Sequence, residues 1–213
     1  MSRYLYYHFV AVALGLGLLV GCGRGEGKAA PGKDDYYGAV LAPPVPQPDF
    51  TLPTTDGRPF HLAAETRGYV TLLFFGYTHC PDVCPVHMAN LASVFNRLPA
   101  GVAGSIKVIF VTVDPKRDTP LVLRKWLDHF QPSFIGLRGS LDEVNQIQRL
   151  FHMPPTGTER LPNGGYVVGH GAPLIGLVGD SIRVLYPFGT RQADWMHDLP
   201  MLVAAIPRER KAD

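Results

Sequence analysis

The chain has 213 residues, of which 46% are hydrophobic and 18% are charged, and its formal net charge is +2. This length suits one well-packed domain, and the composition is typical of a folded globular protein. The small net charge and the lack of a long block of like charges do not favour a polyanion as partner. We therefore expect no nucleic-acid binding.

The N-terminus has the pattern of a bacterial lipoprotein signal peptide. Arg3 precedes an apolar run from Phe9 to Val20, which is short for a membrane span. Small residues directly before Cys22 resemble a lipobox, in which the cysteine is lipidated and becomes the mature N-terminus. The predictions are a signal peptide over residues 1–21 and a lipid on Cys22, which would hold the body at the extracytoplasmic face of a bacterial membrane. An uncleaved anchor is the alternative.

The next segment favours a linker. Residues 22–48 are rich in glycine, lysine and proline, and they end in Ala-Pro-Pro-Val-Pro-Gln-Pro. Such a stretch cannot bury a core, and its prolines favour extended polyproline II. We expect a flexible linker here, then a single domain over residues 49–207 and a polar tail over residues 208–213.

Strands and helices alternate through this domain. The first part predicts a β-hairpin around Asp56-Gly57, a buried strand over 69–77, a helix over 85–98, a second buried strand over 106–113 and a helix from Pro120 to about His129 that is capped by Thr119. The second part predicts a short strand over 134–137, a helix to about Phe151 that opens on a Ser140–Glu143 capping box, a loop over 153–165, a hairpin of 174–178 with 182–186, and a last helix over 192–206 containing Pro200. This order describes an α/β protein with a thioredoxin-like fold and an N-terminal β-hairpin extension.

Two cysteines carry the chemistry. Cys80 and Cys84 lie four residues apart, on a loop that runs into a predicted helix. The dipole and free amides of a helix N-terminus favour thiolate and lower thiol pKa values. Two close thiolates suit a soft ion such as copper(I), and they equally suit a reversible disulfide. A structural disulfide or two buried thiols is the plainer interpretation, so the motif alone is ambiguous.

A family resemblance narrows the choice. The segments FFGYTHCPDVCP and VTVDPKRDTP, followed by a histidine just before the late hairpin, resemble the Sco (SenC) family over about Pro48 to Ile206. Members are copper chaperones associated with assembly of the dinuclear CuA centre of cytochrome c oxidase. The resemblance implies a thioredoxin fold that binds one copper ion, as Cu(I) or Cu(II), through Cys80, Cys84 and His170. It also implies that Asp82 and Asp114 support the site without binding the metal.

The neighbouring residues have plainer interpretations. His79 and His87 are expected to be solvated surface histidines, and Met88 falls on the apolar stripe of the helix. Arg117 is expected to pair with a nearby carboxylate. Asp82 is interpreted equally well as a turn residue whose side chain bonds local amides.

One departure from the family pattern concerns the residues after the histidine. Members commonly have a serine there and no proline nearby, whereas this chain continues with Gly171, Ala172 and Pro173. A proline close to active thiols is typical of thiol–disulfide oxidoreductases, so Pro173 favours dithiol exchange.

Three functions from different classes stay open. The first is a copper metallochaperone that passes copper to cytochrome c oxidase subunit II or another acceptor, with another chaperone as a possible donor. The second is a thiol–disulfide reductase that acts on the acceptor's cysteines through Cys80 and Cys84. The third is a tethered interaction module whose cysteines staple a loop. A peroxidase would need a Pro-x-x-x-Thr-x-x-Cys pattern that is missing here, and we expect no enzyme in the turnover sense.

Overall fold

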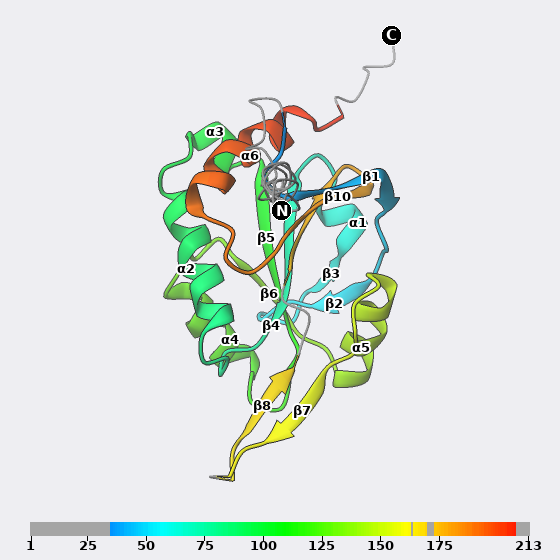
Figure 1. Ribbon diagram of the computed structural model, residues 1–213. Helices are drawn as coiled ribbons and strands as arrows, with labels where there is room; N and C mark the ends of the chain where they lie inside the picture. Colours follow the sequence, from blue (N-terminus) through cyan, green and yellow to red (C-terminus); the bar gives the residue numbers. More distant parts are fainter. Residues whose placement is uncertain (1–34, 163, 170–172, 208–213) are drawn as a thin grey trace, which may run out of the picture. The chain divides into compact units, whose positions relative to one another are not determined.

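The computed structural model describes residues 35–162, 164–169 and 173–207. Its centre is a six-stranded sheet with the strand order β1-β10-β9-β4-β5-β6 (Figure 1). The strands β4, β5 and β6 are parallel, whereas β9 is antiparallel to β4, β10 to β9 and β1 to β10. The bounds are β1 (Ala39–Pro46), β4 (Val70–Gly76), β5 (Ile106–Thr112), β6 (Ile135–Leu137), β9 (Leu174–Val178) and β10 (Ser181–Tyr186).

Two small hairpins and six helices complete the described part of the chain. The hairpins are β2 (Thr51–Pro53) with β3 (Pro59–His61), and β7 (Gly157–Arg160) with β8 (Tyr166–Gly169). The helices are α1 (Leu62–Glu65), α2 (Val83–Phe95), α3 (Ala100–Ala103), α4 (Pro120–Asp128), α5 (Leu141–Leu150) and α6 (Gln192–Ala204). The thioredoxin-like α/β fold and the β2–β3 hairpin confirm the prediction.

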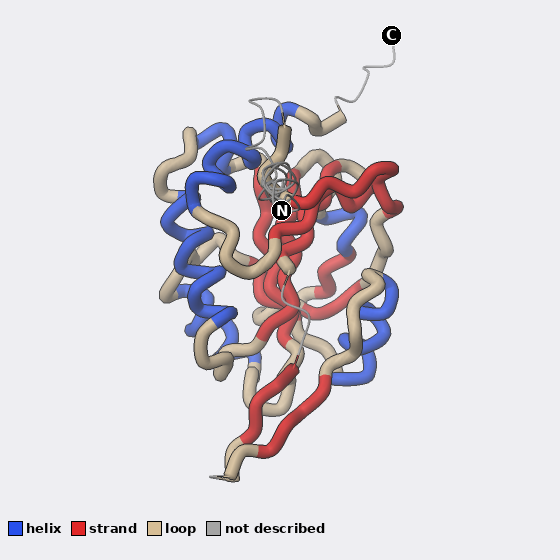
Figure 2. Tube along the Cα trace, in the orientation of Figure 1, coloured by secondary structure: helices blue, strands red, loops and turns tan. Residues whose placement is uncertain are grey.

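Helices cover both faces of the sheet, as Figures 1 and 2 show. All seven residues of β4 are buried, which explains its continuous apolar sequence. Successive side chains of a strand point to opposite faces. Phe74 accordingly packs against His87 of α2, while Phe75 packs against Phe151 just after α5. The core therefore has two layers, one on each side of β4.

Local signals set the helix starts. The side chain of Thr119 accepts a hydrogen bond from the amide of Val122, with Pro120 at the first position of α4. Ser140 and Glu143 form the predicted capping box, each accepting from the other's amide. The last helix runs through Pro200 as one element.

The end of the predicted linker is a strand. Residues 39–46, interpreted from sequence as part of a flexible tether, form β1 and pair with β10 at the edge of the sheet. Proline is tolerated on an edge strand because its missing amide can face solvent, and the pairing is irregular between Val40 and Val45, where Pro43 and Pro44 lie. The buried carboxylate of Asp198 in α6 also accepts from the amide of Gly38. Proline content alone therefore misplaced the start of the domain.

The predicted loop over 153–165 contains another difference. It holds β7, which pairs with β8 in register from Gly157↔Gly169 to Arg160↔Tyr166. All four β7 residues are exposed, so no hydrophobic alternation marks the strand in the sequence.

Within the described residues, no helix combines the length and the apolar character needed to cross a membrane. The predicted signal peptide, the lipidation site Cys22 and the tail over 208–213 lie outside these residues.

Candidate dithiol and metal site

The two cysteines lie where β4 gives way to α2. The amide of Cys80 donates to the carbonyl of Tyr77 (3.2 Å), which tightens the turn after the strand. Asp82 is the N-cap of α2, and its side chain accepts from the amide of Val83 (2.6 Å). Cys84 is therefore in the first turn of the helix. The Asp82 side chain therefore bonds a local amide, as the turn interpretation of the sequence expected.

The structure shows no disulfide between the two cysteines, and both are nearly inaccessible. Cys80 is 9% exposed and Cys84 is fully buried. The amide of Cys84 donates to the Sγ of Cys80 (3.3 Å), so an amide of the first helical turn points at this sulfur. The thiols form one unit because a hydrogen bond also links the Cys84 side chain to Cys80. Such a pair presents two sulfurs to one ion.

The acidity of Cys84 differs from the prediction. The hydrogen bond to Cys80 and, after it, burial raise the pKa of the Cys84 thiol far above its ordinary value. The expected lowering by the helix N-terminus is wrong for this cysteine, since the side-chain hydrogen bond and the loss of solvent outweigh it. This shift favours the neutral thiol form of Cys84.

A glycine makes room for the Cys84 sulfur. A Cβ at Gly76 would lie 2.9 Å from the Sγ of Cys84, 2.7 Å from Phe74 and 2.8 Å from Phe110. Side chains larger than hydrogen therefore do not fit at the end of β4 without displacing this sulfur. This role was not predicted, although a glycine in an otherwise bulky β-strand is a visible signal of close packing.

Asp118 fastens the cysteine loop to the sheet. Its fully buried carboxylate accepts from the amide of Thr78 (3.0 Å) and the hydroxyls of Thr78 (2.6 Å) and Thr112 (2.6 Å). Thr78 precedes Cys80 by two residues, and Thr112 ends β5. Asp118 was not among the residues predicted for the site. No local sequence pattern marks this role, because the partners of Asp118 lie 6 and 40 residues away along the chain.

Asp114 belongs to a second polar cluster beside the loop. It is 4% exposed, forms an ion pair with Arg117 and accepts from the hydroxyl of Tyr166 (2.9 Å). The Arg117 guanidinium lies over the Tyr166 ring, 3.7 Å from its centroid, and faces the Tyr77 ring at 5.6 Å. The predicted ion pair of Arg117 is confirmed. The hydrogen bond from Tyr166 to Asp114 therefore holds β8 next to the end of β5.

The predicted ligand His170 lies outside the described residues, as do Gly171 and Ala172. The strand that leads to it is described. The amide of Val168 in β8 donates to the hydroxyl of Tyr77 (3.2 Å), and Tyr77 precedes Cys80 by three residues. Burial raises the pKa of the Tyr77 hydroxyl, and the nearby thiols add to the rise. The described residues contain no cluster of three or more His, Cys, Asp or Glu able to hold a metal ion.

The other two histidines of the region differ from each other. His79 is 51% exposed at its side chain, as expected for a surface residue. His87 is 2% exposed and packs against Phe74, Phe188 and Trp195, so the prediction of a solvated histidine is wrong. Its ring lies on the same buried face of α2 as Met88, which is core as expected.

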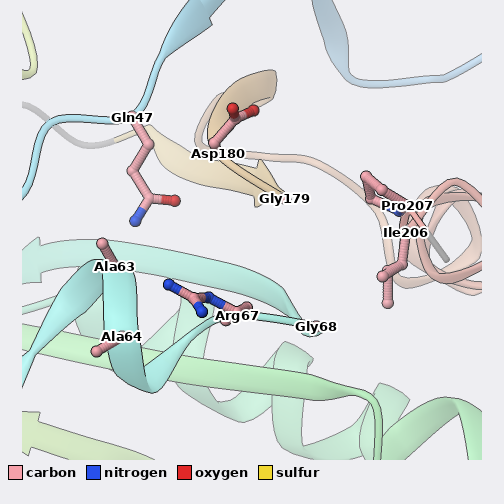
Figure 3. Close-up of a pocket in the computed structure, with 9 residues that line it drawn as sticks. All are labelled: Gln47, Ala63, Ala64, Arg67, Gly68, Gly179, Asp180, Ile206 and Pro207. Atoms are coloured by element: carbon pink, nitrogen blue, oxygen red, sulfur yellow. The ribbon is translucent and has the colours of Figure 1, made fainter. Parts of the chain in front are cut away.

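A cavity of about 810 Å³ is separate from this chemistry (Figure 3). Gly68 lies just before β4 begins, and Gly179 and Asp180 form the turn between β9 and β10. The cysteines follow the other end of β4, and a strand of seven residues is about 20 Å long. Arg67 and Asp180 are among the residues that line this cavity, which contributes nothing to the thiols.

Comparison with known proteins places these features in a family. The SCO1/SenC family model matches residues 41–202. The mitochondrial SCO2 homolog of Bos taurus is 32% identical over 155 residues, which are 72% of this chain and 58% of that protein. The chain thus spans less than two thirds of the length of that relative.

Solved structures agree with this assignment. The solution structure of apo Sco1 from Thermus thermophilus superimposes with a TM-score of 0.70 at 35% identity, over 79% of this chain and 97% of that one. The structure of copper-bound ScoI from Bradyrhizobium japonicum superimposes with a TM-score of 0.66 at 28% identity, over 74% of this chain and 99% of that one. The chain belongs to the SCO1/SenC family.

Proposed function

We propose that this protein is a copper metallochaperone that binds one copper ion through Cys80, Cys84 and His170 and delivers it to the CuA site of cytochrome c oxidase. The observation that carries the proposal is the pair of adjacent cysteine sulfurs at the start of α2, where the Cys84 amide donates to the Cys80 sulfur. Thiolates are soft ligands and suit copper(I). That copper is bound in a family structure 28% identical to this chain supports the choice of metal.

The placement of β8 supports His170 as the third ligand. This strand is hydrogen-bonded to Tyr77, directly before the cysteine loop, and it ends at Gly169. His170 is the next residue, so an imidazole at this position completes a set of two sulfurs and one nitrogen. Burial of Cys80 and Cys84 limits access of water and oxidants to the sulfurs. Transfer then proceeds by exchange of these ligands for those of the acceptor.

The proposed setting is the extracytoplasmic face of a bacterial membrane. A lipid on Cys22 would tether the domain there, where subunit II of cytochrome c oxidase or another acceptor receives the metal. A second copper chaperone is a suitable donor. A thiol–disulfide reductase that uses the same two cysteines on the acceptor is the competing function, and it has no use for a nitrogen ligand.

Copper titration of the reduced soluble domain tests the proposal. The parent is expected to bind one copper ion, whereas Cys80→Ser and His170→Ala are each expected to bind clearly more weakly. His79→Ala is the matched control, because His79 adjoins Cys80 yet is exposed, and it is expected to bind like the parent. Equal binding by His170→Ala and the parent would reject the three-ligand site and favour dithiol exchange.

A further inference from the structure

A groove of about 440 Å³ lies beside the cysteine loop. One wall is a single face of the β7–β8 hairpin, since Thr158 pairs with Val168 and Arg160 with Tyr166, and all four line the groove. Glu159, one residue out of step on β7, points to the other face. The opposite wall is the turn from Val113 to Lys116 after β5, with Leu141 at the start of α5. We call this space the hairpin groove.

The charge of the hairpin groove is positive. Its one lining carboxylate, Asp114, is already paired with Arg117 and hydrogen-bonded by Tyr166. Lys116 and Arg160 are exposed, and neither forms an ion pair with another residue that the structure describes. Leu141, at the start of α5, is 38% exposed and gives the groove an apolar surface. The lining therefore offers two unpaired cations and an exposed leucine to a ligand.

The hairpin groove adjoins the proposed metal site. Tyr166 lines the groove, and the Arg117 guanidinium lies between its ring and that of Tyr77. Val168, which also lines the groove, donates its amide to the Tyr77 hydroxyl. Tyr77 leads directly into the cysteine loop. A chain bound in the groove therefore lies next to the residues that hold the thiols.

We infer that the hairpin groove docks an extended acidic segment of the copper acceptor. This inference rests on the proposed function, because it assigns the groove to the protein that receives the metal. Complementary charge steers two proteins together and fixes their register, which ligand exchange between two sites requires. The hairpin supplies Arg160 and the β5 turn supplies Lys116, so an acidic segment bridges both walls.

A peptide titration tests the groove apart from copper transfer. The probe is a synthetic octapeptide of alternating Glu and Gly, with a Gln-Gly counterpart as neutral control, added to the isotopically labelled full chain in detergent. The acidic probe is expected to shift amide resonances of Thr158, Arg160 and Lys116, and Lys116→Glu/Arg160→Glu is expected to remove the shifts. Shifts that appear elsewhere, no shifts, or equal shifts with inorganic phosphate would overturn the inference, the last because a small anion would then suffice.

Transfer kinetics connect the groove to function. Lys116→Glu/Arg160→Glu is expected to keep the parent's copper affinity and to slow transfer to a purified CuA domain about tenfold or more at low salt. Lys125→Glu/Arg183→Glu is the matched control, because it changes net charge equally at two exposed positions outside the groove, and it is expected to transfer at nearly the parent's rate. Equal slowing by both pairs would overturn the inference. Failure of the parent to bind copper would instead refute the proposed function, and the peptide result would still decide the groove.

Discussion

Replacement of Gly76 by alanine tests how closely the strand controls the Cys84 sulfur. The new Cβ would meet that sulfur at 2.9 Å and two phenylalanine carbons at 2.7 Å and 2.8 Å, whereas ordinary contacts begin near 3.4 Å. Each neighbour must therefore retreat by about half an ångström or more, and all three side chains are fully buried. Overpacking of this kind costs about 1–3 kcal/mol. If overpacking destabilises the copper-bound protein by about 1.4 kcal/mol more than the metal-free protein, copper binds about tenfold more weakly.

The assay is urea denaturation of the reduced domain together with copper titration of Gly76→Ala. Gly101→Ala is the matched control, since nothing lies within 4 Å of a Cβ at Gly101 and the residue is helical. Its stability is expected to stay within about 1 kcal/mol of the parent. Were Gly76→Ala to unfold at the parent's midpoint and bind copper with the parent's affinity, the argument that this glycine accommodates the sulfur would be refuted.

Three further predictions concern the acid groups and the thiols. Asp118→Asn places an amide donor against the donors from Thr78 and Thr112, so we expect the free energy of unfolding, measured by urea denaturation, to fall by about 1–3 kcal/mol. The control Asp128→Asn changes an exposed residue and is expected to lower the free energy of unfolding little. Equal decreases in the two variants would contradict the role of Asp118. Because the pKa of Cys84 is raised, copper(I) must displace a proton from this thiol when it binds at neutral pH. The apparent copper affinity is therefore expected to rise with pH, by up to about tenfold per pH unit for each proton displaced. A pH-independent affinity in competition titrations would contradict this prediction. Hydrogen bonds from Ser140 lower the pKa of Glu143 below its ordinary value of 4.5. The ionised Glu143 therefore stabilises the folded state above pH 4.5, and this stabilisation is lost as the pH falls through the lowered pKa. The stability lost in Ser140→Ala, about 1 kcal/mol at neutral pH, should therefore shrink on acidification, and a constant difference in thermal unfolding would exclude the capping box as its cause.

Much of the fold could be predicted because its signals are local. The uniformly apolar sequence of β4, the caps at Thr119 and Ser140, and the turn between β9 and β10 each specify an element within a few residues. The β1 and β7 strands could not be predicted in the same way. Both are mostly exposed, and their partners β10 and β8 supply the pairing that their own sequences do not announce.

The candidate site was predictable in its residues and less so in their environment. The spacing of the two cysteines and the helix after them identified the dithiol. The acidity of Cys84 depends on the hydrogen bond to Cys80 and on burial, which no spacing reveals. The same holds for His87, since contacts with Phe188 and Trp195, about a hundred residues away along the chain, bury it. Burial by long-range packing contributes to both properties, and local sequence patterns do not show it.

X-ray absorption spectroscopy of the copper-loaded protein tests the central claim most directly, because it counts the sulfur and nitrogen donors on the metal. We predict two sulfur donors and one imidazole in the parent, loss of one sulfur in Cys84→Ser, and loss of the imidazole signature in His170→Ala. An imidazole signature that persists in His170→Ala, or a copper ion with fewer than two sulfur donors in the parent, would contradict the proposed site.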